Sequence, residues 1–258
     1  MKTVLNGIIC AFVQNGIDWA ITAVITYFTV RYATRQYYNK TRIMVAKNTM
    51  EQGLRALLKL DYNEELPDNA KVIFVEYKGR CYTITKKNRS RTDCDFFGKI
   101  RRTVATVGGD TMGVSPYRPR DYGVLGVANV LMKPVLFNFQ NGELYNYEFG
   151  KFVKLSTVKK GNSYMYKAPS GEEKELSETD TARDIMIAIP IESNGKLVGG
   201  VTFDMQVGAK TLYQNIEVSD TEEIKIKKEQ NNSKVMKSVR RTANNLVSAY
   251  FKKKGEDI

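Results

Sequence analysis

Two apolar runs joined by a short polar turn stand out in the second half of the chain. The runs are Ile185–Ile191 and Leu197–Phe203, and the segment between them contains Asn194-Gly195. Apolar, β-rich runs that flank an Asn-Gly pair predict a β-hairpin. Pro190 has no N–H for a strand ladder, so we expect it at a strand end or at an edge. Gly199-Gly200 would weaken an ordinary strand and indicates a bulge or a close backbone approach.

The first apolar stretch runs from Val4 to Val30 and carries one charge, on Asp18. About 20 residues suffice to cross a bilayer as a helix, so the stretch predicts a membrane-spanning helix over residues 1–31. Basic residues then precede the first acid, Glu51, which predicts a cytoplasmic location for the rest of the chain. They are Arg31, Arg35, Lys40, Arg42 and Lys47. A helix in the membrane plane and a buried helix of a soluble protein remain the alternatives.

Three polar residues interrupt this apolar stretch. Gln14 and Asp18 are four positions apart and share one face of a helix, which Asn15 borders. An aspartate near the middle of a span costs about 3 kcal/mol, which is tolerable where it faces another helix. The three residues therefore predict an oligomer seam or the wall of a water-filled path.

The spacing of apolar residues predicts the order of the remaining elements. Helical spacing continues to about Leu60, so residues 32–66 form a connecting helix and its end. The following elements are a hairpin of Lys71–Tyr77 with Arg80–Thr85, a helix at Asp95–Val107, a loop at Gly108–Tyr122, a helix at Val124–Leu131, a strand at Val135–Phe139, a hairpin of Lys151–Val158 with Ser163–Lys167, and a basic helix from about Asp220 to Lys254.

Composition narrows the chemistry. The chain has 258 residues, of which 42% are hydrophobic and 26% charged, as in ordinary folded proteins. A net charge of +12 implies attraction to an anionic partner. The absence of histidine excludes a Ser-His-Asp triad and a histidine zinc site. Cys10, Cys81 and Cys94 form no C-x-x-C pair and indicate reduced thiols. The sequence shows no recognisable pair of a nucleophile and a general base, so no catalytic residue is predicted.

The Gly108–Tyr122 loop combines arginines with tyrosines. Arginine forks bind anions and aromatic rings stack on heteroaromatic ligands, so the loop predicts a small-ligand site. An ordinary surface loop has the same composition. With two residues from outside the loop, the predicted ligand-binding set is Arg101, Asp110, Tyr117, Arg118, Arg120, Asp121, Tyr122 and Asp184.

The order of these segments resembles that of a GAF domain. The matching residues are Gly123, Gly126, Pro134-Val135, Ala188–Ile191, Asn194-Gly195, Val198-Gly199 and Asp204. The resemblance implies an α+β fold with a GAF-like central antiparallel sheet of five or six strands and the N- and C-terminal helices on one face. It also implies a ligand pocket on the other face, roofed by residues of the 95–182 region, and dimers formed through the terminal helices. No histidine or suitably placed cysteine supports a haem or bilin, so we expect no cofactor.

These observations predict four parts: a membrane helix (1–31), a juxtamembrane helix (32–66), a GAF-like core (67–219) and a C-terminal basic helix (220–258). The first hypothesis is a single-pass, membrane-anchored sensory protein without enzymatic activity. Its cytoplasmic domain would bind a small ligand such as a nucleotide, or a partner, and signal as a homo-oligomer. The first alternative is a ligand-gated membrane effector, pore-forming or toxin-like. A basic nucleic-acid-binding protein is disfavoured because no nucleic-acid-binding motif is present.

Overall fold

The predicted hairpin lies in the middle of the larger of two sheets. In the computed structural model, β10 (Arg183–Ser193) and β11 (Lys196–Gln206) pair antiparallel along their length. Asn194 and Gly195 form the turn with φ angles of 52° and 68°. Positive φ at both central residues is the type I′ geometry, which matches the twist of the flanking strands. The predicted hairpin is confirmed.

The structure describes residues 2–78, 100–108, 117–119, 122–178, 182–209, 213–214, 216–217 and 219–252. The chain divides into two units, Met1–Met44 and Val45–Ile258. Helix α1 (Lys2–Leu58) begins in the first unit and ends in the second. The four-part division predicted above stays a prediction.

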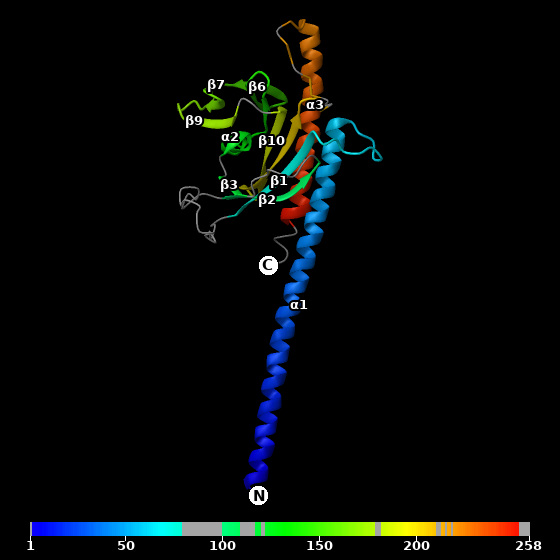
Figure 1. Ribbon diagram of the computed structural model, residues 1–258, viewed down its shortest axis with the longest axis vertical. Helices are drawn as coiled ribbons and strands as arrows, with labels where there is room; N and C mark the ends of the chain where they lie inside the picture. Colours follow the sequence, from blue (N-terminus) through cyan, green and yellow to red (C-terminus); the bar gives the residue numbers. More distant parts are fainter. Residues whose placement is uncertain are drawn as a thin grey trace. The chain divides into compact units, whose positions relative to one another are not determined.

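The second unit is built on an eight-stranded antiparallel sheet with the order β3-β2-β1-β11-β10-β4-β5-β6, beside a three-stranded sheet with the order β7-β8-β9 (Figure 1). Its other elements are β1 (Ala70–Lys78), β2 (Ile100–Val107), β3 (Tyr117–Pro119), α2 (Gly123–Leu131), β4 (Val135–Asn138), β5 (Glu143–Glu148), β6 (Lys151–Leu155), β7 (Thr157–Lys160), β8 (Ser163–Lys167), β9 (Glu173–Glu178), α3 (Glu222–Leu246) and the π-helix η2 (Val247–Lys252).

One face of the larger sheet, the α3 face, packs against α3 and η2. Successive side chains of a strand alternate between faces, and directly opposed residues share a face. Phe74 on β1 lies opposite Val201 on β11, and its ring contacts the ring of Tyr250 in η2 at 5.1 Å. Residues Val45–Leu58 of α1 lie beside α3 (Figure 1). The two helices meet where a Cβ on Gly53 would lie 2.4 Å from the hydroxyl of Thr242.

The opposite face, the α2 face, packs against α2 and the three-stranded sheet. Its buried cluster joins the sheet residues Val75, Phe137 and Ala188 to Leu125 of α2. Tyr166 of β8 and Leu176 of β9 belong to the same cluster. Each large side chain buried in this way stabilises the fold by about 1.5–3 kcal/mol. The protein is thus an α+β fold with covering layers on both faces of a large antiparallel sheet.

The glycine pair of β11 brings both covering layers close to the sheet. A Cβ on Gly199 would lie 2.4 Å from the carbonyl oxygen of Val75 and 3.1 Å from the Phe251 ring. A Cβ on Gly200 would lie 2.7 Å from the side chain of Leu125 on the other face. The pairing of β10 with β11 also shifts beside this pair, between Ile191 and Glu192. Both features expected of this pair, the close approach and the bulge, are present.

The structure corrects several of the predicted elements. Residues Ile100–Val107 form β2, not a helix, because the β-branched residues of T-V-A-T-V pair with β1. The segment Lys151–Val158 belongs to two strands of different sheets, β6 paired with β5 and β7 paired with β8. The larger sheet has eight strands instead of five or six, because short strands extend both its ends. The predicted strand Arg80–Thr85 lies outside the described residues.

The predicted membrane topology is wrong. Across the described part of the chain, no helix has the length and apolar character needed to cross a membrane. In α1, the polar residues Gln14, Asn15 and Asp18, together with threonines further along, interrupt the apolar stretch. The expected single-pass location with a cytoplasmic C-terminal domain is therefore withdrawn, and the pore-forming alternative loses the spanning helix on which it depended.

We expect Gly199→Ala to destabilise the protein more than Gly200→Ala. The new methyl group at 199 would meet a backbone carbonyl of β1, which cannot move without disturbing the β1–β11 pairing, at a cost of about 3 kcal/mol. The methyl group at 200 would meet a side chain that can rotate, at a cost of about 1 kcal/mol. Denaturant unfolding measures both free energies. Equal losses would contradict this account of the two contacts.

Candidate functional site

Among the described strands, none pairs with the β4 side of β10 from Pro190 onward. β4 pairs with β10 only from Ile185 to Ala188. The N–H of Phe139 donates to the carbonyl of Asp184 at 2.9 Å, so even-numbered residues of β10 direct their backbone groups toward β4. By this alternation Pro190 would face Lys133, whose N–H donates instead to Ala128 in α2 at 3.2 Å. Pro190 therefore lies at a position where no backbone N–H is needed for strand pairing, in agreement with the edge position expected from its missing N–H.

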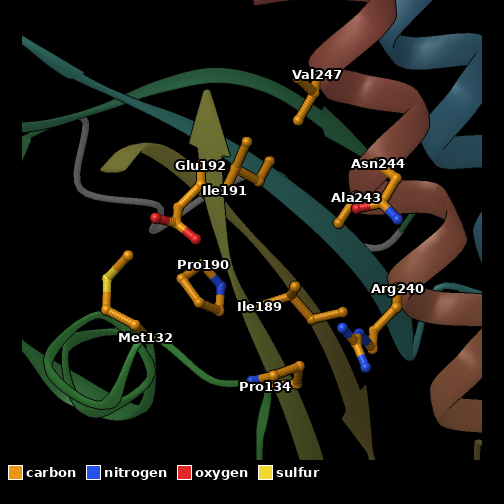
Figure 2. A pocket seen from close by; sticks show the side chains of 10 residues that line it. All are labelled: Met132, Pro134, Ile189, Pro190, Ile191, Glu192, Arg240, Ala243, Asn244 and Val247. Carbon is orange, nitrogen blue, oxygen red and sulfur yellow. The ribbon is translucent and has the colours of Figure 1, made fainter. Parts of the chain in front are cut away.

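A pocket of about 160 Å³, the β10 pocket, opens at this uncovered edge (Figure 2). Its walls come from the loop between α2 and β4, from β10 itself, and from the end of α3 with the start of η2. The lining residues are Met132, Pro134, Ile189, Pro190, Ile191, Glu192, Arg240, Ala243, Asn244 and Val247. The pocket exists because the chain leaves the sheet at Pro134 while β10 continues along its pairing with β11.

Opposite charges flank the apolar part of the pocket. Figure 2 shows the Glu192 carboxylate on one side of β10 and the Arg240 guanidinium on the other. Asn244 follows Arg240 by one helical turn on α3, so both line the same wall. Neither Glu192 nor Arg240 has an ion-pair partner among the residues described. The pocket thus offers one acid and one base that a ligand could engage.

The helical wall of the pocket contains the junction between α3 and η2. The N–H of Val247 donates to the carbonyls of both Ala243 and Asn244, at the point where the α-helix passes into the π-helix. Residues from Val247 to Lys252 then follow π-helical geometry. Such π-turns are rare and are frequent at functional sites. The pocket is therefore placed at the least regular point of the C-terminal helix.

A charged pair with a buried aspartate lies at the other end of β10 and β11. Asp204 is 1% exposed, and its carboxylate lies 3.2 Å from the Nε of Arg183. Within the described part of the chain, neither carboxylate oxygen has a hydrogen-bond partner. Burial raises the pKa of Asp204 above its ordinary value, although Arg183 and Lys71 both lower it. The Arg183 guanidinium also lies 5.8 Å from the centre of the Phe139 ring, a cation–π contact.

Asp184 is the one acid of the predicted set whose side chain the structure describes. It is half-buried, and burial raises the pKa of its carboxyl group. One of its carboxylate oxygens has no hydrogen-bond partner among the residues that the structure describes. Asp184 is adjacent in sequence to Arg183, so a second carboxyl group accompanies the buried charged pair. In the described part of the chain, no group of three acidic or cysteine side chains could hold a metal ion.

The structure locates the other predicted site residues only in part. Asp110, Arg120 and Asp121 lie outside the described residues. Strands β2 and β3 place the backbone of Arg101 directly opposite that of Arg118, and Tyr117 opposite Arg102. Tyr122 precedes α2 and is exposed. Gln14, Asn15 and Asp18 all lie on α1.

None of the predicted site residues lines the β10 pocket. The pocket residues Glu192, Arg240 and Asn244 were not predicted, because β10 and α3 are far apart in sequence. The one local signal was Pro190, whose presence inside an apolar strand marks an uncovered edge. The predicted ligand site in residues 101–122 stays a prediction.

Comparison with known proteins gives weak similarity. No family model and no curated protein matches the chain. Among solved structures, the phycocyanobilin-bound GAF domain of a cyanobacterial phytochrome is 12% identical, with a TM-score of 0.37, covering 87% of this chain and 93% of its own. The GAF domain of a two-component sensor histidine kinase from Bacillus halodurans is 10% identical, with a TM-score of 0.31, covering 76% and 92%.

A structure outside the signalling GAF domains is similar to the same degree. The type II free methionine-R-sulfoxide reductase from Thermoplasma acidophilum is 10% identical, with a TM-score of 0.34, covering 80% of this chain and 97% of its own. Similarity at this level decides neither the function nor the ligand of the chain. The functional argument therefore rests on the geometry of the chain itself.

We expect Asp204→Asn to change how stability depends on pH. The ordinary pKa of this carboxyl is 3.8, and burial raises it in the folded state, so the folded protein keeps a proton that the unfolded chain has lost. The free energy of unfolding of the wild type therefore falls as pH rises from about 4 through the raised pKa, and Asp204→Asn removes that part of the fall. Denaturant unfolding at a series of pH values measures the difference between the two proteins.

The stability of Asp204→Asn relative to the wild type should accordingly increase with pH over this range. The contribution of Asp184 is the same in both proteins and cancels. A relative stability that decreases with pH would show that the attraction of Arg183 and Lys71 outweighs the effect of burial.

Proposed function

We propose that this chain is a regulatory protein that binds a small ligand in the β10 pocket and has no enzymatic activity. The observation that carries the proposal is the position of this pocket between the central strand β10 and the junction of α3 with η2. Residues of both kinds line it, seven apolar and three polar (Glu192, Arg240 and Asn244), and a small-molecule site needs apolar contacts together with a few polar groups. A non-enzymatic role is supported by the absence of histidine, the commonest general base.

A ligand in this pocket would affect how the C-terminal helix packs against the sheet. The rings of Tyr250 and Phe251 in η2 contact Phe74 on the sheet at 5.1 and 5.8 Å. The Tyr250 hydroxyl also lies 3.4 Å from the carboxylate of buried Glu76. A ligand between β10 and Val247 would favour the arrangement of η2 with which it makes more contacts. Such a difference in affinity between two arrangements is what a regulatory ligand requires.

The proposed function also includes the association of two or more copies of the chain through α1. Four exposed apolar residues follow the alternating spacing of four and three that forms a coiled-coil seam: Ile21, Ile25, Phe28 and Tyr32. The same spacing continues toward the N-terminus through Asp18 and Gln14, which belong to the predicted oligomer seam. A second copy of α1 would cover this stripe. Association of this kind would carry a change at the domain to the assembly.

The first test is a thermal-shift screen of the full chain against metabolites and nucleotides. A ligand at ten times its Kd should raise the Tm by about 3–6 °C. Asn244→Trp should abolish this shift, because the indole would fill the pocket. Asn245→Trp is the matched control, since Asn245 is also exposed on α3 but does not line the pocket. A screen without hits, or hits equally sensitive to both variants, would contradict the proposed site.

The second test addresses α1. The double variant Ile25→Lys with Phe28→Lys places two charges in the seam and should convert the assembly to a monomer, because like charges would be forced together. Tyr27→Lys with Val30→Lys is the control, since these exposed residues lie off the seam. Light scattering after size-exclusion chromatography measures the mass. A monomeric wild type, or equal loss of association in both double variants, would contradict association through this seam.

A further inference from the structure

We propose that the turn between β5 and β6, together with the neighbouring exposed side of α3, binds the surface of an anionic lipid bilayer. In this contact Phe149 enters the head-group layer, cations of α3 attract the anionic lipids, and no segment of the chain crosses the bilayer. The inference goes beyond the proposed function and depends neither on the β10 pocket nor on its ligand.

Phe149 is the most exposed large hydrophobic residue in the described part of the chain, at 96% exposure. An aromatic ring exposed to this degree contributes almost no apolar burial to the fold. Its φ angle of 49° lies in the left-handed region, where a bulky residue is an outlier. Gly150 follows with a φ of 84°, and Glu148 pairs with Lys151, so the two residues form a complete hairpin turn.

The turn between β10 and β11 shows which residues this geometry favours. Asn194 and Gly195 occupy the same two positions there, with φ angles of 52° and 68°. Asparagine tolerates the left-handed region, because its short polar side chain forms local hydrogen bonds, and phenylalanine does not. Phe149 is therefore unfavourable for the fold in both its backbone conformation and its exposure. A contact that buries the ring outside the fold would compensate for both.

The turn is held against α3 at its base. The Ser233 Oγ donates to the carbonyl of Gly150 at 3.3 Å, and the Tyr147 hydroxyl lies 2.7 Å from the same Oγ. Figure 1 shows β6 beside α3. A Cβ on Gly150 would meet no atom within 4 Å beyond its chain neighbours, so the turn has open space around it. The tip is thus fixed in position and accessible to a large surface.

The exposed side of α3 beside this turn is positively charged. Lys234 and Lys237 follow Ser233 by one and four residues, and Arg241 lies one helical turn beyond Lys237. These three residues, the α3 cations, are exposed, and none forms an ion pair with a residue that the structure describes. The sequence contains no acid from 231 to 255, so no nearby charge of α3 neutralises them.

The packing of α3 leaves this side accessible. Each residue of an α-helix turns by about 100°, so Thr242 lies about 180° from Ser233 around the helix axis. Thr242 packs against Gly53, which places the segment Val45–Leu58 of α1 on the opposite side of α3. The α3 cations all lie within about 100° of Ser233. The cations and the turn that Ser233 holds can therefore contact one surface.

A lipid surface fits both the ring and the charges. The boundary between head groups and acyl chains accepts a protruding aromatic ring without a matching pocket, whereas a protein partner needs a pocket for such an anchor. Anionic head groups attract each nearby lysine or arginine and strengthen binding by about fivefold per cation. Duplex nucleic acid would also attract the cations, but its phosphate backbone offers no apolar layer for Phe149.

The test is co-sedimentation of the full chain with vesicles of phosphatidylcholine, prepared with and without phosphatidylserine. We expect binding that requires phosphatidylserine. It should weaken between about 0.1 M and about 1 M salt, because the Debye length falls from about 10 Å to about 3 Å. Equal binding to both kinds of vesicle, or no binding to either, would overturn the inference.

Variants of the turn test the contribution of the ring. Phe149→Asn should weaken vesicle binding by about tenfold or more, because the apolar contact is lost. It should leave the free energy of unfolding unchanged or raise it, since asparagine suits this turn. Tyr62→Asn is the matched control, because it removes another exposed ring, 85% exposed, from the acidic loop after α1. A loss of binding equal to that of the control would contradict a role for Phe149.

Charge reversal tests the α3 cations. Lys234→Glu with Lys237→Glu should weaken binding by about 25-fold or more, because two attractive charges become repulsive. Lys159→Glu with Lys196→Glu is the control, since it changes the net charge equally at exposed lysines outside α3. Equal losses would show that the net charge, and not the α3 surface, decides binding. Binding to duplex DNA in place of vesicles would also overturn the lipid contact.

A fluorescent ring measures insertion directly. Trp19 is the one tryptophan in the sequence, so Trp19→Phe with Phe149→Trp leaves a single indole, at the turn. Its emission should move to shorter wavelength on vesicle binding and should be quenched by brominated lipids. Tyr62→Trp in the Trp19→Phe background should show neither change. Binding without a change at position 149 would overturn the insertion.

These outcomes are independent of the proposed function. Neither Phe149 nor the α3 cations line the β10 pocket. A chain that fails every vesicle test can still bind a small ligand with the sensitivity to Asn244→Trp expected above, and a chain without such a ligand can still bind vesicles.

Discussion

The close approach of both covering layers at Gly199-Gly200 is the constraint on which the second unit depends. One glycine lets the backbone of β1 and the ring of Phe251 come near β11, and the next lets Leu125 of α2 do so from the other face. A side chain at either position would push one layer outward. Val247 of η2 and the loop that follows α2 line the β10 pocket, so the layers that these two glycines admit are the ones next to the pocket walls.

The pocket itself follows from a mismatch in strand length. β10 continues to Ser193 because its pairing with β11 supports it, whereas β4 begins at Val135 after the chain leaves α2. A strand edge without a neighbour exposes backbone groups, and Pro190 removes one donor from that edge. The end of the C-terminal helix forms one wall of the pocket at this edge, and its change from α to π geometry begins at Val247 in that wall.

Charge is distributed unevenly between the two ends of the hairpin. At one end, Asp204 is buried against Arg183, and burial raises the pKa of its carboxyl. At the other end, Glu192 and Arg240 remain exposed on either side of β10. Removing Arg183 would leave a buried carboxylate without its counter-charge, so this pair suits a structural role. Glu192 and Arg240 have no ion-pair partner among the described residues, so each is accessible to a ligand.

The sequence by itself determined the hairpin, its Asn-Gly turn and the helix at residues 124–131, because each depends on local spacing and turn chemistry. The glycine pair indicated a bulge or a close approach, and the α+β class followed from the resemblance to a known fold. Local patterns gave a wrong prediction where strand pairing decides the structure: the segment T-V-A-T-V forms a strand because it pairs with β1. The membrane-spanning helix was also wrongly predicted, because polar residues interrupt the apolar N-terminal stretch too often. The β10 pocket was decided by tertiary structure alone. Its acid, Glu192, lies on a strand and its base, Arg240, on a helix nearly fifty residues later. No periodicity in the sequence indicates that both line one pocket, which opens where a third segment leaves the sheet.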